Sequence, residues 1–243
     1  MNNKKSQNPK QNVKLVLGTN NVHKLNEFRS ILKRLILENY SESDLSVLDF
    51  IGTASDFEIS DIPETALTFE DNSKLKAEAV FEKSNLPTLA DDSGLIVDIL
   101  GNAPGILSAR WSGAHTDNDD NMNLLLAQMK DIPFEGRSAH FLCCMTLICP
   151  SVEPSSEKPS SREAQMKVAV GKCYGYLNDA RLGAGGFGYD PIFMPNAYFG
   201  NYQSSPSGGR SFADLPDSFK NVHSHRAKAT EQLFDKIYKI LSE

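Results

Sequence analysis

The amino-acid sequence predicts an α/β fold, in which a single two-lobed domain carries a long mixed β-sheet flanked by helices around a cleft. Three observations predict this fold. A short apolar strand at 13–17 runs through a polar turn into an amphipathic helix, which makes a βα unit. Further strands and helices alternate along the chain. Two longer segments, 138–148 and 166–176, show the partial alternation of paired strands.

The helices are predicted from capping residues and apolar spacing. Asn21 is a suitable N-cap for the first helix, in which the apolar residues at helical spacing are Leu25, Phe28, Ile31, Leu32 and Leu35. Thr68 opens the second helix, because Asp71 three residues later completes a capping-box pattern. The third helix is expected over 119–130. The last is expected over 225–241, with an apolar stripe of Leu233, Phe234, Ile237, Ile240 and Leu241.

The remaining strands are predicted from short apolar runs. One is expected at 47–51, and another at 86–90 leads directly into a turn, Asp91-Asp92-Ser93-Gly94. Apolar residues 95–99 continue beyond that turn. The segment 151–165 is rich in Pro and Ser and indicates an exposed hairpin insertion, and the polar segment 200–210 is interpreted in the same way.

The composition is that of an ordinary globular protein. The 243 residues are 40% hydrophobic and 23% charged, enough for one good-sized domain or two small ones. The net charge of −6 argues against a nucleic-acid partner, although it permits a locally basic pocket for a small anion. No apolar segment approaches transmembrane length, so no membrane partner is expected.

The N-terminal residues and the cysteines favour a cytoplasmic protein. Residues 1–12 contain neither an apolar signal core nor an arginine, and they are expected to form a short disordered tail. The cysteines lack zinc-like spacing and are interpreted as buried reduced thiols in a reducing compartment: Cys143, Cys144, Cys149 and Cys173.

Asp91 and Asp92 are the most informative residues of the chain. In open α/β sheets ligands bind at the carboxyl ends of strands, and ionised carboxylates are costly to bury without compensation. The pair therefore indicates chemistry, although Asp-Ser-Gly is also common in plain turns. Glu64, in the loop before the second helix, would add oxygen ligands for Mg²⁺, which typically uses one or two carboxylates together with substrate phosphates.

Two groups of residues could bind an anion. The turn from Thr19 to Lys24 precedes the first helix, where backbone N–H groups and a lysine favour a phosphate. The alternative is that Asn21 only caps the helix and Lys24 is solvated. Lys220, His225 and Arg226 gather near the start of the last helix, where cations oppose the helix dipole. A nucleotide facing them would explain this arrangement, and ordinary polar residues of a first helical turn are the alternative.

The segment from Gly183 to Gly188 fits GxGxxG by letter. Pro191 and Pro195 prevent a helix from following it, so a dinucleotide-binding fold is not predicted. The segment is interpreted as a glycine-rich loop leading into aromatic and acidic residues that could hold a planar base. A core loop with its aromatic rings packed inward is the alternative.

Together these residues resemble the inosine triphosphate pyrophosphatase family, which removes non-canonical purine nucleoside triphosphates. The matching blocks follow the family order from about residue 13 to the C-terminus: 19–27, 64–69 with Asn72, Lys76 and Ala77, 90–95, 103–110, 185–191, and Lys220 with 224–226. Asn20 departs from the usual glycine and His23 from a small residue. Asn tolerates a left-handed backbone, so the turn is expected to survive.

The resemblance implies an ITPase-like pyrophosphatase domain over 13–243, a homodimer, and Mg²⁺-dependent cleavage of ITP, dITP or XTP to the monophosphate and pyrophosphate. By matched position, Asp92 is the implied general base and metal ligand, with Glu64 and Asp91 as further metal ligands. The implied contacts to the small-molecule substrate are Thr19, Asn20, Asn21, Lys24 and Lys76 for the phosphates, then Ser93, and Phe187, Gly188, Tyr189, Asp190, Lys220, His225 and Arg226 for the base.

Two alternative functions stay open at this point. One is a related nucleotide pyrophosphatase with a different base preference, in which the phosphate machinery is retained and the base pocket differs. The other is a non-catalytic nucleotide-binding protein, against which the intact acids and lysines argue. The insertions at 151–165 and 200–210 fall in loops, so they bear on dimer geometry more than on the chemistry.

Overall fold

The computed structural model describes residues 12–60, 62–113, 117–150, 164–196 and 209–243. The expected tail at 1–12 and the two insertions at 151–165 and 200–210 therefore lie almost entirely outside the described residues. Within the described ranges, no helix is both long enough and apolar enough to cross a membrane.

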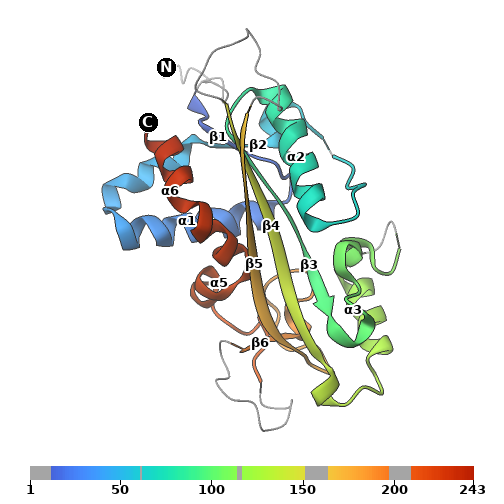
Figure 1. The fold of residues 1–243 in the computed structure, drawn as a ribbon. Helices are drawn as coiled ribbons and strands as arrows, with labels where there is room; N and C mark the ends of the chain where they lie inside the picture. Colours follow the sequence, from blue (N-terminus) through green and yellow to red (C-terminus); the bar gives the residue numbers. More distant parts are fainter. Residues whose placement is uncertain (1–11, 61, 114–116, 151–163, 197–208) are drawn as a thin grey trace, which may run out of the picture. The chain divides into compact units, whose positions relative to one another are not determined.

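Six strands form one mixed sheet in the order β2-β1-β3-β4-β5-β6 (Figure 1). Strand β1 is parallel to both β2 and β3, whereas β5 and β6 are antiparallel. The predicted α/β class with a mixed sheet is thus confirmed. The strands are β1 (Leu15–Leu17), β2 (Ile51–Thr53), β3 (Thr88–Val97), β4 (Ser138–Cys149), β5 (Gln165–Leu177) and β6 (Phe193–Pro195).

The predicted helices are also present, with the expected caps. The Asn21 side chain accepts hydrogen bonds from the N–H groups of His23 and Lys24, and the Thr68 side chain accepts one from Asp71. Each cap satisfies backbone donors that the first helical turn leaves without intrahelical partners. The helices are α1 (Val22–Asn39), α2 (Phe69–Ser84), α3 (Asn118–Gln128), α5 (Asp217–His223) and α6 (His225–Ser242).

The strand predicted at 47–51 was wrong except at its last residue. Residues 42–50 form a 3₁₀ helix, and β2 begins only at Ile51. The 3₁₀ helix starts at a capping box in which Ser41 and Asp44 satisfy each other's backbone groups. The capping box therefore places the apolar residues of this segment in a 3₁₀ helix, and the strand prediction did not take that capping box into account.

The turn predicted at residues 91–94 was also wrong, because β3 runs unbroken through Asp91, Asp92 and Ser93. Strand β1 ends at Leu17, which pairs with Leu89, so the two acids follow directly after the parallel pairing. Strand β3 continues beyond that point because β4 flanks it on the other side. The acids thus lie beside the carboxyl end of β1 but within an ordered strand.

The chain divides into two compact units. Unit 1 comprises residues 1–92, 145–169 and 230–243, and unit 2 comprises 93–144 and 170–229. In unit 1, the Ser73 hydroxyl of α2 lies 2.7 Å from the Thr146 hydroxyl, whereas Thr230 of α6 contacts the sulfur of Met145 at 3.8 Å. Adjacent strand residues face opposite sides of a sheet, so α2 and α6 cover opposite faces of β4 (Figure 1).

Unit 2 has a core of its own. Apolar residues of β3 and α3 pack there with three aromatic rings, Phe141, Phe193 and Phe212. The ring of Phe193 lies 4.6 Å from that of Phe141 and 5.3 Å from that of Phe212. All four cysteines lie within the described ranges and are buried thiols, as predicted.

Candidate functional site

In unit 1, two lysines connect the three predicted acids to the helices. Lys24, in the first turn of α1, donates to both carboxylate oxygens of Asp91 at 3.2 and 3.0 Å. The Lys76 ammonium of α2 lies 2.7 Å from Glu64 Oε1 and 3.5 Å from Asp92 Oδ1. Neighbouring residues of a strand point to opposite faces. Asp91 therefore meets α1, whereas Asp92 meets α2.

Burial and neighbouring charges together set the proton affinities in this cluster. Burial raises the pKa of Asp92 above its ordinary value, despite the opposing effect of the Lys76 ammonium and of the hydrogen bond from Asn72. Burial also disfavours the charged form of Lys76, but the combined attraction of Asp91, Asp92 and Glu64 raises the pKa of Lys76. Asp92 is consequently a stronger proton acceptor than an exposed aspartate, and it lies beside a lysine that stays charged.

Asn72 is a site residue to which the sequence reasoning assigned no role. Its side chain is fully buried, its Nδ2 donates to Asp92 Oδ2 at 3.0 Å, and its Oδ1 accepts from the Ala66 N–H at 2.9 Å. Residues four apart share one face of a helix, so Asn72 and Lys76 both reach Asp92 from α2. Two polar residues at that spacing on a buried helix face were the available signal.

In the turn before α1, three predicted side chains make structural hydrogen bonds. Thr19 Oγ1 accepts from the Asn21 N–H at 3.1 Å, Asn20 Nδ2 donates to the Ile59 carbonyl at 3.3 Å, and Asn21 caps α1. The capping interpretation of Asn21 is thus confirmed, whereas Lys24 is paired with Asp91 rather than solvated. Backbone N–H groups and the Lys24 ammonium are what this turn can offer a phosphate.

Gly18 allows that turn to lie close to the acids. A Cβ on Gly18 would come within 2.7 Å of the Ala90 Cβ, closer than real side chains approach. Strands β1 and β3 therefore meet here without a side chain on the β1 side. This approach places Lys24 within reach of Asp91, the residue that follows Ala90.

The acids of unit 1 match the ligand chemistry of Mg²⁺. Glu64, which is partly exposed, and Asp92, which is buried, converge on one cation, the Lys76 ammonium. Within the described ranges, no three His, Cys, Asp or Glu side chains gather into a ready-made cage. Mg²⁺ is usually held by one or two carboxylates with phosphate oxygens and water, so a converging pair is the set of donors it needs.

In unit 2, the glycine-rich loop closes on its own acid. Asp190 accepts a hydrogen bond from the Phe187 N–H at 3.2 Å and another from Lys220 of α5 at 3.1 Å. Gly186 lies beneath these groups with φ of +75°, and a Cβ there would clash with the Asp190 carboxylate and lie 2.8 Å from Lys220 Nζ. Only glycine fits both the backbone conformation and the space.

The first two residues of α6 are buried rather than solvated. The His225 ring stacks on Phe141 with centroids 4.9 Å apart, and the Arg226 guanidinium lies 5.2 Å from the Phe187 ring. A Cβ on Gly171 of β5 would clash with the His225 carbonyl, so the start of α6 rests directly on the sheet. Both residues are therefore packed into unit 2, and whether a nucleotide faces them stays a prediction.

The core-loop interpretation of the glycine-rich loop is confirmed for Tyr189, whereas the base-holding interpretation stays a prediction. Tyr189 is buried and its hydroxyl donates to the Ser108 carbonyl at 2.8 Å, as in a core loop. Phe187 is only half-buried and contacts Arg226. No helix follows Gly188, in agreement with the exclusion of a dinucleotide fold, since a 3₁₀ turn at 190–192 leads into β6.

The predicted residues thus form two groups, one in each unit. Unit 1 holds the acids and the lysines at 24 and 76, together with the turn at 19–21. Unit 2 holds the glycine-rich loop, Lys220, His225 and Arg226. Ser93 follows Asp92 in β3 and begins unit 2.

Comparisons with known proteins extend over nearly the whole chain. The profile of the Ham1 family matches residues 15–236. A protein named dITP/XTP pyrophosphatase from Streptomyces coelicolor is 39% identical over 228 residues, which covers 94% of this chain and 98% of that protein. A protein of the same name from Halalkalibacterium halodurans is 38% identical over 218 residues, which covers 90% of this chain and 95% of that protein.

Solved structures show the same fold. A HAM1 protein from Coxiella burnetii superposes with a TM-score of 0.70 at 29% identity, covering 93% of this chain and 99% of that one. The Ham1 protein from Staphylococcus aureus gives a TM-score of 0.67 at 30% identity, with 93% and 98% covered.

Proposed function

This chain belongs to the Ham1 family, and we propose that it hydrolyses ITP, dITP and XTP to the nucleoside monophosphate and pyrophosphate, which cleanses the nucleotide pool. The observation that carries the proposal is the cluster of Glu64 with the buried residues Lys76 and Asp92, in which a carboxylate of raised pKa lies beside a charged lysine. The relatives named dITP/XTP pyrophosphatase support the substrate class, since they match over nearly their full length.

In the proposed reaction, Asp92 orients a water and accepts its proton as the water oxygen attacks the α-phosphorus. A bond forms between that oxygen and phosphorus, and the bond from the α-phosphorus to the bridging oxygen breaks, so that pyrophosphate leaves. Asn72 holds the Asp92 carboxylate in place through the 3.0 Å hydrogen bond. Lys24 and Lys76 neutralise phosphate oxygens. Each lysine then exchanges a carboxylate partner for a phosphate oxygen, which the negative charge of the substrate favours.

Glu64 and Asp92 would hold Mg²⁺ together with the substrate phosphates, and Asp91 would assist. When bound, the ion supplies positive charge that stabilises the pyrophosphate leaving group. Their convergence on the Lys76 ammonium supports this assignment, because both carboxylates face one cation.

The residues of unit 2 would select the base. Phe187 offers a ring face, and Lys220 and Arg226 offer donors that suit the 6-oxo group of hypoxanthine or xanthine. Adenine has an amino group at that position, which would leave such donors unpaired. Gly188, Tyr189, Asp190 and His225 would shape this base pocket, and Ser93 would contact the substrate from β3.

We also propose that the protein is a cytoplasmic homodimer without a nucleic-acid or membrane partner. The net charge of −6 supports the absence of a nucleic-acid partner. Buried thiols suit a reducing compartment.

The test is a substrate panel with purified protein and Mg²⁺, in which pyrophosphate and orthophosphate are resolved. Pyrophosphate from ITP, dITP and XTP, with little from ATP or GTP, is the expected result. Equal turnover of pyrimidine or canonical triphosphates would contradict the base preference, and release of orthophosphate would contradict the reaction. A chain that binds ITP without any product would be a binding protein.

A further inference from the structure

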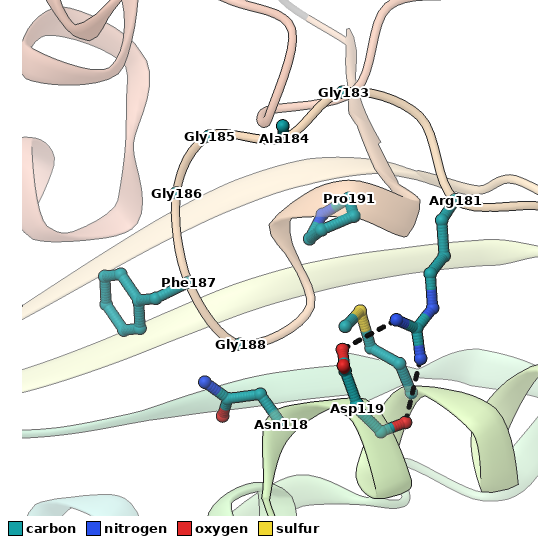
Figure 2. A pocket seen from close by; sticks show the side chains of 11 residues that line it. Asn118, Asp119, Arg181, Gly183, Ala184, Gly185, Gly186, Phe187, Gly188 and Pro191 are labelled. Carbon is teal, nitrogen blue, oxygen red and sulfur yellow. Dashed lines mark hydrogen bonds and ion pairs between the residues drawn. The ribbon is translucent and has the colours of Figure 1, made fainter.

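A pocket of about 280 Å³ separates the glycine-rich loop of unit 2 from the first turn of α3 (Figure 2). The loop backbone from Gly183 to Gly188 forms one wall, and Asn118, Asp119 and Met122 of α3 belong to another. Across this space the loop does not rest on packed side chains, as it would in a core. Its position on this side therefore depends on what bridges the pocket.

Arg181 bridges it. One guanidinium nitrogen donates to Asp119 Oδ1 at 2.6 Å, and the other donates to the Asp119 carbonyl at 3.0 Å and to Asn123 Oδ1 at 2.8 Å. Asp119 and Asn123 are four residues apart and so share a face of α3. Figure 2 shows the arginine reaching from the start of the loop to the helix, with Phe187 near the other end of the loop.

The rest of the loop is held against other segments. The Gly185 N–H donates to the Ala213 carbonyl at 3.2 Å, and Asp190 at the far end is paired with Lys220. Gly183, Gly186 and Gly188 all have positive φ, so the loop backbone has many alternative conformations in its free state. At the beginning of the loop, the Leu182 N–H donates to the Pro191 carbonyl at 2.8 Å and the Leu182 carbonyl accepts from the Ser211 hydroxyl at 2.7 Å. Arg181, two residues before the first glycine, adds the side-chain contact from this end of the loop to α3.

We propose that Arg181 is a positioning residue for base recognition. By holding α3, it keeps the glycine-rich loop in the conformation that presents Phe187 to the base. This inference rests on the proposed function. Loss of the Arg181 contacts would lower the fraction of molecules that hold the loop in this conformation, and the apparent affinity for substrate falls in proportion to that fraction. The chemistry at the phosphates is unaffected.

The test is Arg181→Ala, compared with wild type in steady-state hydrolysis of ITP. We expect KM to rise about fivefold with kcat nearly unchanged. The ion pair of Arg181 with Asp119 is largely exposed, and exposed pairs contribute up to about 1 kcal/mol, which corresponds to about a fivefold change in affinity. Arg181→Lys is expected not to rescue KM, because one ammonium cannot reproduce the planar fork. Asp119→Ala added to Arg181→Ala is expected to change nothing further, because the two share one interaction.

The matched control is Arg34→Ala, which removes an arginine of α1 that also bridges two elements, with contacts to Glu38 at 2.7 Å and Glu231 at 2.5 Å. Its KM should equal that of wild type. An unchanged KM in Arg181→Ala, a fall in kcat alone, or the same rise in the control would each overturn the proposal.

A second measurement separates this inference from the proposed function. Trp111 is the chain's single tryptophan, and its indole N–H donates to Gln128 of α3 at 2.9 Å. Titration with IMP, followed by the fluorescence of Trp111, needs no turnover. A Kd about fivefold weaker in Arg181→Ala supports the anchor even if wild type releases no pyrophosphate, and an equal Kd refutes it.

Discussion

Asp92 shows the conflict between function and stability at the scale of one residue. Its carboxylate is buried, and burial raises its pKa, which means that the folded chain holds the proton more tightly than the unfolded chain does. The charged form therefore costs stability at neutral pH. That cost is relieved as the pH falls through the folded pKa.

Asp92→Asn is accordingly expected to lower kcat severely and to stabilise the metal-free protein. The amide cannot accept the proton of water, so kcat should fall by about 10²- to 10⁴-fold. In thermal unfolding with EDTA, Tm at neutral pH should equal or exceed that of wild type, and the gain should shrink in acid as Asp92 of wild type takes up its proton. Retention of full turnover by a folded variant would remove Asp92 from the mechanism.

The same raised pKa predicts the acid limb of the activity profile. Asp92 acts in its deprotonated form, so kcat/KM of wild type should fall as the pH drops through the pKa of Asp92. That limb is expected above about pH 4, the ordinary value for an exposed aspartate. A profile that stays flat to about pH 4 would show that no carboxylate of raised pKa serves as the base.

Asn72 can be tested against its own neighbour. Asn72 and Ser73 are both fully buried in α2, but only Asn72 contacts Asp92, whereas Ser73 bonds to Thr146. Each alanine variant should lose about 1 to 2 kcal/mol of unfolding free energy, because each side chain makes two hydrogen bonds. Only Asn72→Ala should lower kcat, by about tenfold, because only there is the base misplaced. Equal kcat values in the two variants would reduce Asn72 to a structural role.

At the scale of elements, the glycine-rich loop offers a matched pair of variants. Gly186 and Gly188 have φ of +75° and +61°, so alanine strains the backbone at both. A Cβ at Gly186 would also displace Asp190 and Lys220, whereas at Gly188 it would meet nothing within 4 Å. Gly186→Ala should therefore raise KM for ITP markedly more than Gly188→Ala. Equal KM values would show that the Asp190–Lys220 pair is not needed for substrate binding.

Elements with local signals could be predicted from the sequence. Asn21 and Thr68 cap their helices through side chains a few residues from the groups they satisfy, so the helix starts were readable. The strand prediction at 47–51 failed because the capping box at Ser41 favours a 3₁₀ helix, whereas the apolar residues alone suggested a strand. The path of β3 through Asp91 and Asp92 could not be read either, since it depends on β4, which is distant in the sequence.

Site partners were harder to predict than site members. The sequence indicated Lys24, Lys76 and the three acids as candidates, but not that Lys24 pairs with Asp91, 67 residues away. Such pairings follow from which face of β3 each acid occupies and which helix covers that face. For the same reason the hydrogen bond from Asn72 to Asp92 could not be predicted, because it depends on α2 lying beside Asp92.

At the scale of the whole molecule, the proposed function gives phosphate chemistry to unit 1 and base selection to unit 2. Lys76→Met in unit 1 should lower kcat for every triphosphate alike, since phosphates are common to all of them. Lys220→Met in unit 2 should instead reduce the preference for ITP over ATP, because it removes a donor for the 6-oxo group. Competition assays with mixed substrates measure both effects. A change in base preference from Lys76→Met would contradict the division.

The most direct test of the central claim is the position of oxygen transfer. Hydrolysis of ITP in water enriched in heavy oxygen, followed by mass spectrometry of the products, shows which phosphorus the water attacks. We expect the label in IMP and not in pyrophosphate, because in the proposed mechanism Asp92 directs water to the α-phosphorus. Label in pyrophosphate with unlabelled IMP would mean attack at the β-phosphorus and would contradict the proposed mechanism.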